Sequence, residues 1–116
     1  MARIPTNRVP THPGEMLREE FLKPLALTQT ELAARLGVSY PRVNELVHGK
    51  RDMTPDTALR LERLLGVEAQ FWLNLQLAWD LYHATHSPAA RQIARIKPLT
   101  HGTAGGTSGK RGVAAA

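Results

Sequence analysis

Apolar side chains recur at helical spacing in residues 29–48, QTELAARLGVSYPRVNELVH, and the pattern is interrupted once. The positions expected to face inward are Leu32, Ala33, Leu36, Val38, Val43, Leu46 and Val47. Gly37 stands at the interruption, where a first helix must end and the backbone must turn sharply, a place that favours a residue tolerant of positive φ. The pattern predicts two short helices joined by a tight turn, which presents the outer face of the second helix to the major groove of DNA.

Capping and stop signals predict five helices in residues 12–84, with short connections and no strand. The helix starts are marked by Pro13, by Thr28 with Glu31 three residues later, by Ser39, and by Thr54, Pro55 and Asp56. The expected ends are Pro24, Gly37, His48 before Gly49, and Gly66, and the last helix is expected from about Glu68 to Ala84. The fold class is therefore predicted to be all-α.

Four segments are expected along the chain. Residues 1–11 contain two prolines and no apolar period, so they are expected to form a flexible arm. Residues 12–84 are the helical DNA-binding and dimerisation domain, and residues 85–99 are a short extension that would hold a helix ending before Pro98. Residues 100–116 are basic and rich in glycine, so a disordered tail is expected there.

The net charge of +5 arises entirely from the C-terminal part of the chain. Residues 1–84 carry ten basic and ten acidic side chains, whereas the residues after them carry five basic side chains and no acid. Within residues 35–51, however, four basic side chains outnumber Glu45, and this local excess favours a nucleic-acid partner. The absence of cysteine excludes disulfides, and no apolar run reaches the ~20 residues of a membrane span, so a soluble, cytoplasmic protein is expected.

The outer face of residues 39–48 carries side-chain types that read base edges. Asn44 suits bidentate pairing with adenine, Arg42 with guanine, and a glutamate such as Glu45 can accept from a cytosine amino group. The role of Glu45 stays open, because a steering negative charge or a salt bridge with Arg42 would explain it equally well. Gln29 is expected to contact a phosphate together with free backbone N–H groups. The predicted DNA-binding residues are Gln29, Ser39, Tyr40, Arg42, Asn44, Glu45, His48, Lys50 and Arg51. The alternative is that they form only the solvated face of an amphipathic helix.

The last predicted helix, EAQFWLNLQLAWDLYHA, has two apolar arcs on opposite sides. The aromatic arc comprises Phe71, Trp72, Leu75, Ala78, Trp79 and Tyr82, and the leucine arc comprises Leu73, Leu77, Leu81 and Ala84. One arc is expected to cover the other helices and the other to form a homodimer, unless the helix is central and both arcs are buried. The pattern does not decide between the arcs. Aromatic side chains are typical interface anchors, so the predicted dimer residues are Phe71, Trp72, Leu75, Trp79 and Tyr82.

Three stretches, HPGEMLREEFLKPLALTQTELAARLGVS, NELVHGKRDMTPDTALRLERLLGV and FWLNLQLAWDLYHA, closely resemble the HigA-type antitoxins of the Xre-like helix-turn-helix superfamily. The similarity spans His12 to Ala84, and the FWLNLQ segment is its most diagnostic part. The resemblance implies a five-helix, lambda-repressor-like domain that binds operator DNA as a homodimer and represses its own operon. It also implies that the protein neutralises a RelE-like, mRNA-cleaving toxin. Family DNA contacts carry over to Gln29, Ser39, Tyr40, Arg42, Asn44 and His48.

Two alternatives belong to other functional classes: a solitary Xre-like transcriptional repressor without a toxin, and a protein-interaction module without DNA binding. Catalysis is not expected, and neither is a cofactor, a metal or a small-molecule substrate. His83 and His86 lie three residues apart, but a zinc site needs three or four convergent ligands, and no such set is evident. There is also no phosphate-binding glycine loop and no nucleophile elbow. The histidines, including His12 and His48, are interpreted as ordinary surface residues.

Overall fold

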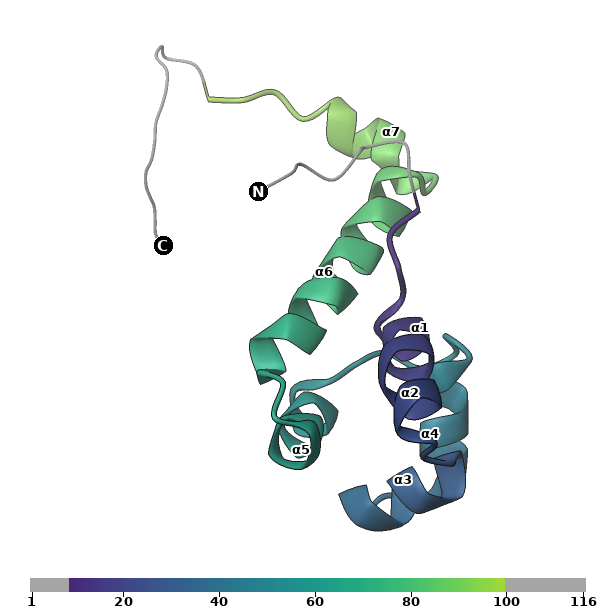
Figure 1. Ribbon diagram of the computed structural model, residues 1–116. Coiled ribbons are helices and arrows are strands. Elements are labelled where there is room, and N and C mark those ends of the chain that lie inside the picture. Colours follow the sequence, from purple (N-terminus) through teal and green to yellow (C-terminus); the bar gives the residue numbers. More distant parts are fainter. Residues whose placement is uncertain (1–8, 100–116) are drawn as a thin grey trace. The chain divides into compact units, whose positions relative to one another are not determined.

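The structure, a computed structural model, describes residues 9–99, and the chain divides between Thr85 and His86 into two units that are considered separately. Every regular element in this part of the chain is a helix, which confirms the all-α fold class (Figure 1). The first unit contains α1 (Pro13–Leu17), η1 (Arg18–Leu22), α2 (Lys23–Leu25), α3 (Gln29–Leu36), α4 (Tyr40–Val47), α5 (Pro55–Leu65) and α6 (Ala69–Thr85), and the second contains α7 (Ala89–Ala94). The expected tail in residues 100–116 and most of the expected arm lie outside the described residues.

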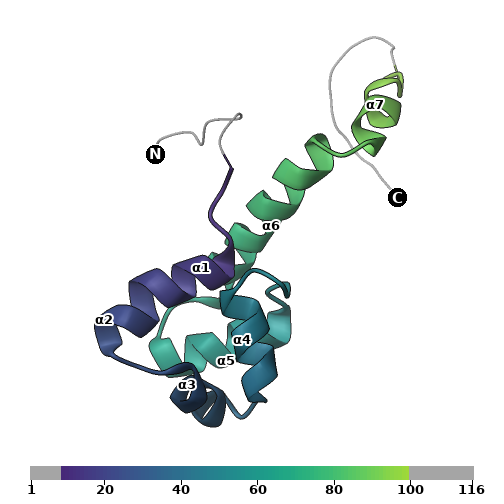
Figure 2. The same ribbon diagram turned by 90° about the vertical axis from the view of Figure 1, so that its right-hand side faces the viewer.

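The first helix continues past the predicted stop at Pro24. Elements α1, η1 and α2 follow one another without a break from Pro13 to Leu25, and the middle element is a π-helix (Figure 2). At its end the N–H of Lys23 donates to the carbonyl of Arg18, five residues back. This wider turn leaves room for a proline ring, which in a regular α-helix would meet the carbonyl four residues earlier. The prediction that Pro24 ends the helix is therefore wrong.

The other helix boundaries follow the signals in the sequence. Thr28 caps α3 and forms a complete capping box with Glu31. Ser39 and Thr54 cap α4 and α5 through their hydroxyl oxygens, which accept hydrogen bonds from backbone N–H groups in the first turn. Gly37 has a φ of 72°, the left-handed conformation in which glycine avoids a steric penalty, and this lets the chain reverse between α3 and α4.

The core of the first unit lies between α1, α3, α4, α5 and α6. Element α1 packs against α4 and α6, α3 packs against α4 and α5, and α5 packs against α6. The buried apolar residues are Leu17, Leu22, Leu32, Ala33, Leu36, Val43, Leu46, Val47, Met53, Ala58, Leu61 and Trp72. The approach of α1 to α4 is tightest at Gly14, where a Cβ atom would overlap the backbone carbonyl of Leu46. Glycine at this position is therefore required for α1 to pass directly over α4.

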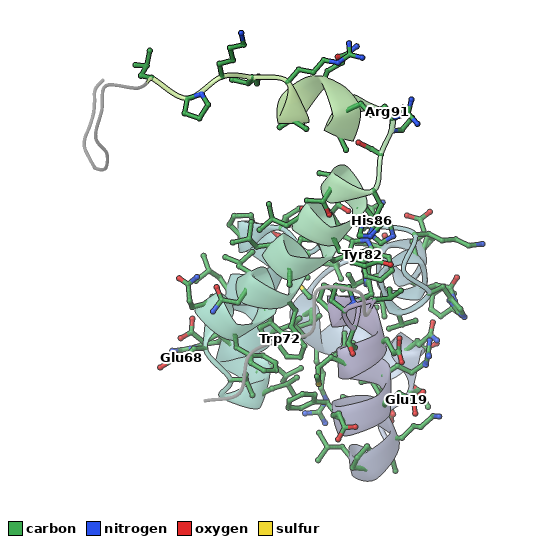
Figure 3. All side chains as sticks on the ribbon, turned by 90° about the horizontal axis from the view of Figure 1, so that it is seen from above. Glu19, Glu68, Trp72, Tyr82, His86 and Arg91 are labelled. Atoms are coloured by element: carbon green, nitrogen blue, oxygen red, sulfur yellow. The ribbon has the colours of Figure 1, made fainter. Side chains whose placement is uncertain are left out.

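One side of α6 packs against the core through aromatic side chains. Trp72 has no exposed surface and lies on the side of α6 that faces α1 (Figure 3). Its ring packs against Phe21 and Phe71, with centroids 5.2 and 5.1 Å away. Two turns further along, Trp79 packs edge-on against His12 at 4.9 Å. The aromatic arc of the sequence is thus mainly the inner side of α6.

The opposite side of α6 is open. Leu77 and Leu81 are 56% and 55% exposed. The C-terminal part of α6 extends past α1–α5 (Figures 1 and 2). The structure contradicts the prediction that Trp72 is a dimer residue. Trp72 has no exposed surface, so its side chain cannot contact a second chain. Leu73 of the leucine arc packs against the core, so the exposed apolar surface of this arc consists of Leu77 and Leu81.

The second unit holds a short helix where one was predicted. α7 runs over Ala89–Ala94, and its first turn follows Pro88. Between His86 and Leu99 the charged side chains are Arg91, Arg95 and Lys97, all of them basic and exposed. This part of the chain is therefore a short basic segment.

Candidate nucleic-acid interface

The inner side of α4 is fixed by packing and by one long-range hydrogen bond. Val43, Leu46 and Val47 are buried in the core. Arg18, on η1, donates from Nη1 to the carbonyl of Val47 at 2.7 Å and so satisfies a backbone acceptor in the last turn of α4. Because Gly14 on α1 also lies directly against the backbone of Leu46, α4 is held in one orientation, and its outer side chains are presented to solvent from a rigid support.

Three predicted DNA-binding residues form one cluster on the outer side of α3 and α4. The Nδ2 of Asn44 donates to Oε1 of Gln29 at 2.9 Å and contacts the hydroxyl oxygen of Tyr40 at 3.4 Å. Tyr40 is exposed, while Gln29 and Asn44 are half-buried. Among residues 9–99, Nε2 of Gln29 and Oδ1 of Asn44 have no hydrogen-bond partner. The cluster, named here the Gln29–Tyr40–Asn44 cluster, therefore offers a donor and an acceptor outward.

Arg42, predicted to read guanine, points instead to the start of α5. Its Nη2 donates to Oδ2 of Asp56 at 2.6 Å and to Oγ1 of Thr57 at 2.7 Å. Arg60 shares the same carboxylate at 2.8 Å and also donates to the carbonyl of Leu36 at the end of α3. Hydrogen bonds from Arg60 and then Arg42 lower the pKa of Asp56, which keeps it ionised. Arg42 thus joins α4 to α5.

The C-terminal end of the predicted site carries a second ion pair. Arg51 donates to Oε1 of Glu45 at 2.8 Å, so the ion-pair partner of Glu45 in the structure is Arg51 and not Arg42. His48 is exposed, and its Nδ1 lies 2.7 Å from the carbonyl of Asn44; because that oxygen only accepts, Nδ1 carries the proton. Lys50 is also exposed and has no ion-pair partner within residues 9–99.

His12 is not the surface residue that was predicted. It is 4% exposed, and its Nδ1 accepts the N–H of Gly14 at 2.9 Å, so it caps α1. Burial lowers the pKa of His12, although Asp52, Asp80 and Glu15 oppose this shift. The sequence carried one signal for this role, the position of His12 directly before Pro13, where an N-cap residue stands.

Sequence reasoning also missed the residues that position α4. Asp56 was interpreted only as part of a helix start, and Thr57, Arg18 and Arg60 received no role. Each acts across 14 to 29 residues of sequence, as in the pairs Arg42–Asp56 and Arg18–Val47. Such contacts have no local pattern, so periodicity and capping rules do not detect them.

Two further kinds of site were considered for the described residues, a metal centre and a membrane-spanning helix. Within residues 9–99 no three histidine, cysteine, aspartate or glutamate side chains gather closely enough to hold a metal ion. None of the helices there combines the length and the apolar character that crossing a bilayer demands.

Known proteins resemble this chain over most of its length. The family model described as helix-turn-helix matches residues 19–72. Virulence-associated protein I of Dichelobacter nodosus is 55% identical over 95 residues, which cover 81% of this chain and 86% of that protein. Antitoxin HigA-1 of Vibrio cholerae is 38% identical over 94 residues, with coverages of 81% and 88%. The solved structure of the Pseudomonas aeruginosa antitoxin HigA with the higBA promoter has a TM-score of 0.73 and 42% identity, covering 78% of this chain and 99% of that one.

Proposed function

The chain belongs to the helix-turn-helix family that includes the HigA-type antitoxins, and on this premise we propose that it binds operator DNA through the outer face of α4. The family is a class of DNA-binding regulators and not of enzymes. The observation that carries the proposal is the Gln29–Tyr40–Asn44 cluster, which stands on a helix whose inner side is fixed by the core.

The cluster is suited to read adenine in the major groove. Adenine offers an acceptor at N7 and a donor at N6. The free Oδ1 of Asn44 matches N6, and N7 would take the amide hydrogen that contacts the Tyr40 hydroxyl oxygen across the longer distance of 3.4 Å. The hydrogen bond to Gln29 restricts the Asn44 side chain before DNA binds, so less conformational entropy is lost in the complex. Nε2 of Gln29 is then available to donate to a phosphate beside the N-terminus of α3.

The other proposed DNA-binding residues have different roles. Ser39, His48, Lys50 and Arg51 are exposed around α4 and suit phosphate or base-edge contacts, and Glu45 orients Arg51. Arg42 would have to release Asp56 and Thr57 to reach a guanine. We therefore assign Arg42 to the support of α4 and not to base reading.

We further propose that the protein binds as a homodimer through the leucine side of α6. Leu77 and Leu81 are exposed there, whereas Trp72 and Trp79 are engaged by their own chain. Phe71, Leu75 and Tyr82 would take part only at the edge of such an interface, because the first two pack against the core. A two-fold pair would place the two copies of α4 on half-sites about 34 Å apart.

The finer proposal is that the chain is a cytoplasmic antitoxin that neutralises a RelE-like, mRNA-cleaving toxin and represses its own operon. Its support is the likeness to proteins named HigA antitoxins over about four fifths of the chain. The test is co-expression with the product of the neighbouring gene, purification through a tag on one partner, and a translation assay. Toxin capture with loss of mRNA cleavage supports the proposal; an unbound, inactive neighbour contradicts it and leaves a solitary repressor.

A further inference from the structure

Gln76 lies at the centre of a buried polar junction between α6 and the segment that follows α4. Its side chain is 6% exposed. Oε1 accepts the N–H of Met53 at 2.6 Å, while Nε2 donates to Oδ1 of Asp80 at 2.9 Å and to Oδ1 of Asp52 at 3.3 Å. One side chain thus fastens α6 to the segment that connects α4 to α5.

Two aromatic contacts flank this junction on the same side of α6. Trp72, about one turn before Gln76, packs against Phe21, and Trp79, about one turn after it, packs against His12. His12 in turn lies next to Gly49, directly after α4, where a Cβ atom would come within 3.8 Å of the ring. Together these contacts set the orientation of α6 relative to α4, and the hydrogen-bonded contact in the middle is the most directional.

We infer that Gln76 is a positioning residue for operator recognition, which sets the distance and angle between the two copies of α4 without touching DNA. The inference rests on the proposed operator binding as a dimer. In that dimer α6 would pair through Leu77 and Leu81 on its outer side, while its inner side holds the segment after α4. The junction therefore lies between the two-fold axis and the DNA-reading helix, so a tilt there changes the separation that DNA fixes at about 34 Å.

Loss of the Gln76 amide is expected to change the distance and angle between the two copies of α4 more than the affinity of one copy for one half-site. An apolar side chain of similar length fills the same space, but it leaves the N–H of Met53 without an acceptor and removes the donor shared by Asp52 and Asp80. The segment after α4 can then shift. The Gln29–Tyr40–Asn44 cluster should be unaffected, because its hydrogen bonds join side chains of α3 and α4 and none of them involves Asp52, Met53 or Gln76.

The test measures the DNA affinity of the full-length wild-type protein and of full-length Gln76→Met on three kinds of duplex. The first holds two half-sites at the native separation, the second holds them at a separation changed by one base pair, and the third holds a single half-site. The wild-type dimer should lose about tenfold or more in affinity when the separation changes, since both copies of α4 must fit one face of DNA. Gln76→Met should reduce this discrimination to about threefold or less, while half-site affinity stays within about twofold. Gln70→Met is the matched control, because Gln70 lies on the same helix but is exposed and, within residues 9–99, bonds only Asn74. It should behave as wild type.

A second variant guards against a folding defect. Gln76→Glu keeps the size of the side chain and the acceptor for Met53 but adds a third carboxylate beside Asp52 and Asp80, so it should also relax the spacing requirement at neutral pH and regain it as the pH falls. Wild-type discrimination in both folded variants overturns the inference, and so does loss of the folded dimer in both, because Gln76 would then be a residue of core stability. Absence of operator binding by the wild-type protein would instead refute the proposed function.

Discussion

The Asn44 side chain, in the middle of α4, donates a hydrogen bond to the side-chain oxygen of Gln29, the first residue of α3, across 2.9 Å. The two helices of the motif are therefore joined on their outer side as well as through the core. The orientation of the Asn44 amide depends on both helices, and it is set before any DNA is bound.

Asn44→Ala should weaken operator binding by about 1–3 kcal/mol and relax the preference at one base pair, because it removes a bidentate base contact. Fluorescence anisotropy on matched and singly mismatched duplexes measures both effects. Asn74→Ala is the control: Asn74 likewise shares a hydrogen bond with a glutamine, accepting it from Gln70 at 2.9 Å, but on the exposed surface of α6. Equal affinities of wild type and Asn44→Ala on both duplexes would reject a base-reading role.

Leu81→Glu should convert the dimer to a monomer, because it places a charge in the apolar side of α6 that is proposed to pair. Sedimentation velocity gives the mass directly. Leu59→Glu is a matched control on α5, since Leu59 is 58% exposed and Leu81 is 55% exposed. If Leu81→Glu remains a dimer, the leucine side is not the interface.

Gly14→Ala should destabilise the protein by more than the 1–3 kcal/mol typical of overpacking, because the added Cβ would overlap a rigid backbone carbonyl of Leu46. Gly66→Ala provides the comparison: its surroundings are open, so only its φ of 77° opposes the change, at a cost of about 1 kcal/mol. Urea unfolding measures both. A smaller loss for Gly14→Ala than for Gly66→Ala would contradict the close crossing of α1 and α4.

His12 should make stability depend on pH below its ordinary pKa of 6.5. Its pKa is lowered in the folded protein, mainly by burial, so the unfolded chain binds the proton more readily. The stabilising contribution is complete above the unfolded value and is lost as the pH falls through the folded value. His12→Asn keeps a capping oxygen without a titrating ring. The urea midpoint of the wild type should therefore drop further than that of His12→Asn between about pH 7.5 and pH 5; parallel curves would count against the buried, neutral histidine.

Neutralising the basic segment, by Arg91→Gln, Arg95→Gln and Lys97→Gln together, should lower the salt dependence of DNA binding while leaving discrimination between operator and random DNA unchanged. The logarithmic slope is expected to fall by about 0.9 for each phosphate that the protein no longer neutralises. Binding isotherms over a range of salt concentrations give the slope. An unchanged slope would show that these side chains do not bind phosphates.

The local features of this fold are predictable from the sequence for a physical reason. Thr28 with Glu31, Ser39, and Gly37 each act on backbone groups within a few residues, so the sequence alone specifies the ends of α3 and α4. The helix through Pro24 was mispredicted because a proline normally ends a helix, and the π turn that accommodates it has no known sequence signal.

The support of the candidate site was less predictable. Arg42 was assigned to a guanine because it lies on the outer edge of α4, and its partner Asp56 comes 14 residues later on another helix. The two arcs of α6 were recognised correctly as arcs, but which one faces inward depends on contacts such as Trp72 with Phe21, across 51 residues of chain. Periodicity defines the faces of a helix, and only packing decides what each face meets.

If the outer face of α4 reads specific duplex DNA from within the major groove, as we propose, the protein must protect its operator against cleavage of the DNA backbone. Hydroxyl-radical footprinting of the DNA upstream of the protein's own gene, at near-physiological salt and with random DNA as competitor, tests it most directly. We expect two protected patches on one face of the duplex, about one helical turn apart, which disappear with Asn44→Ala. Protection that is absent, or that random DNA removes as readily as operator DNA, would contradict it.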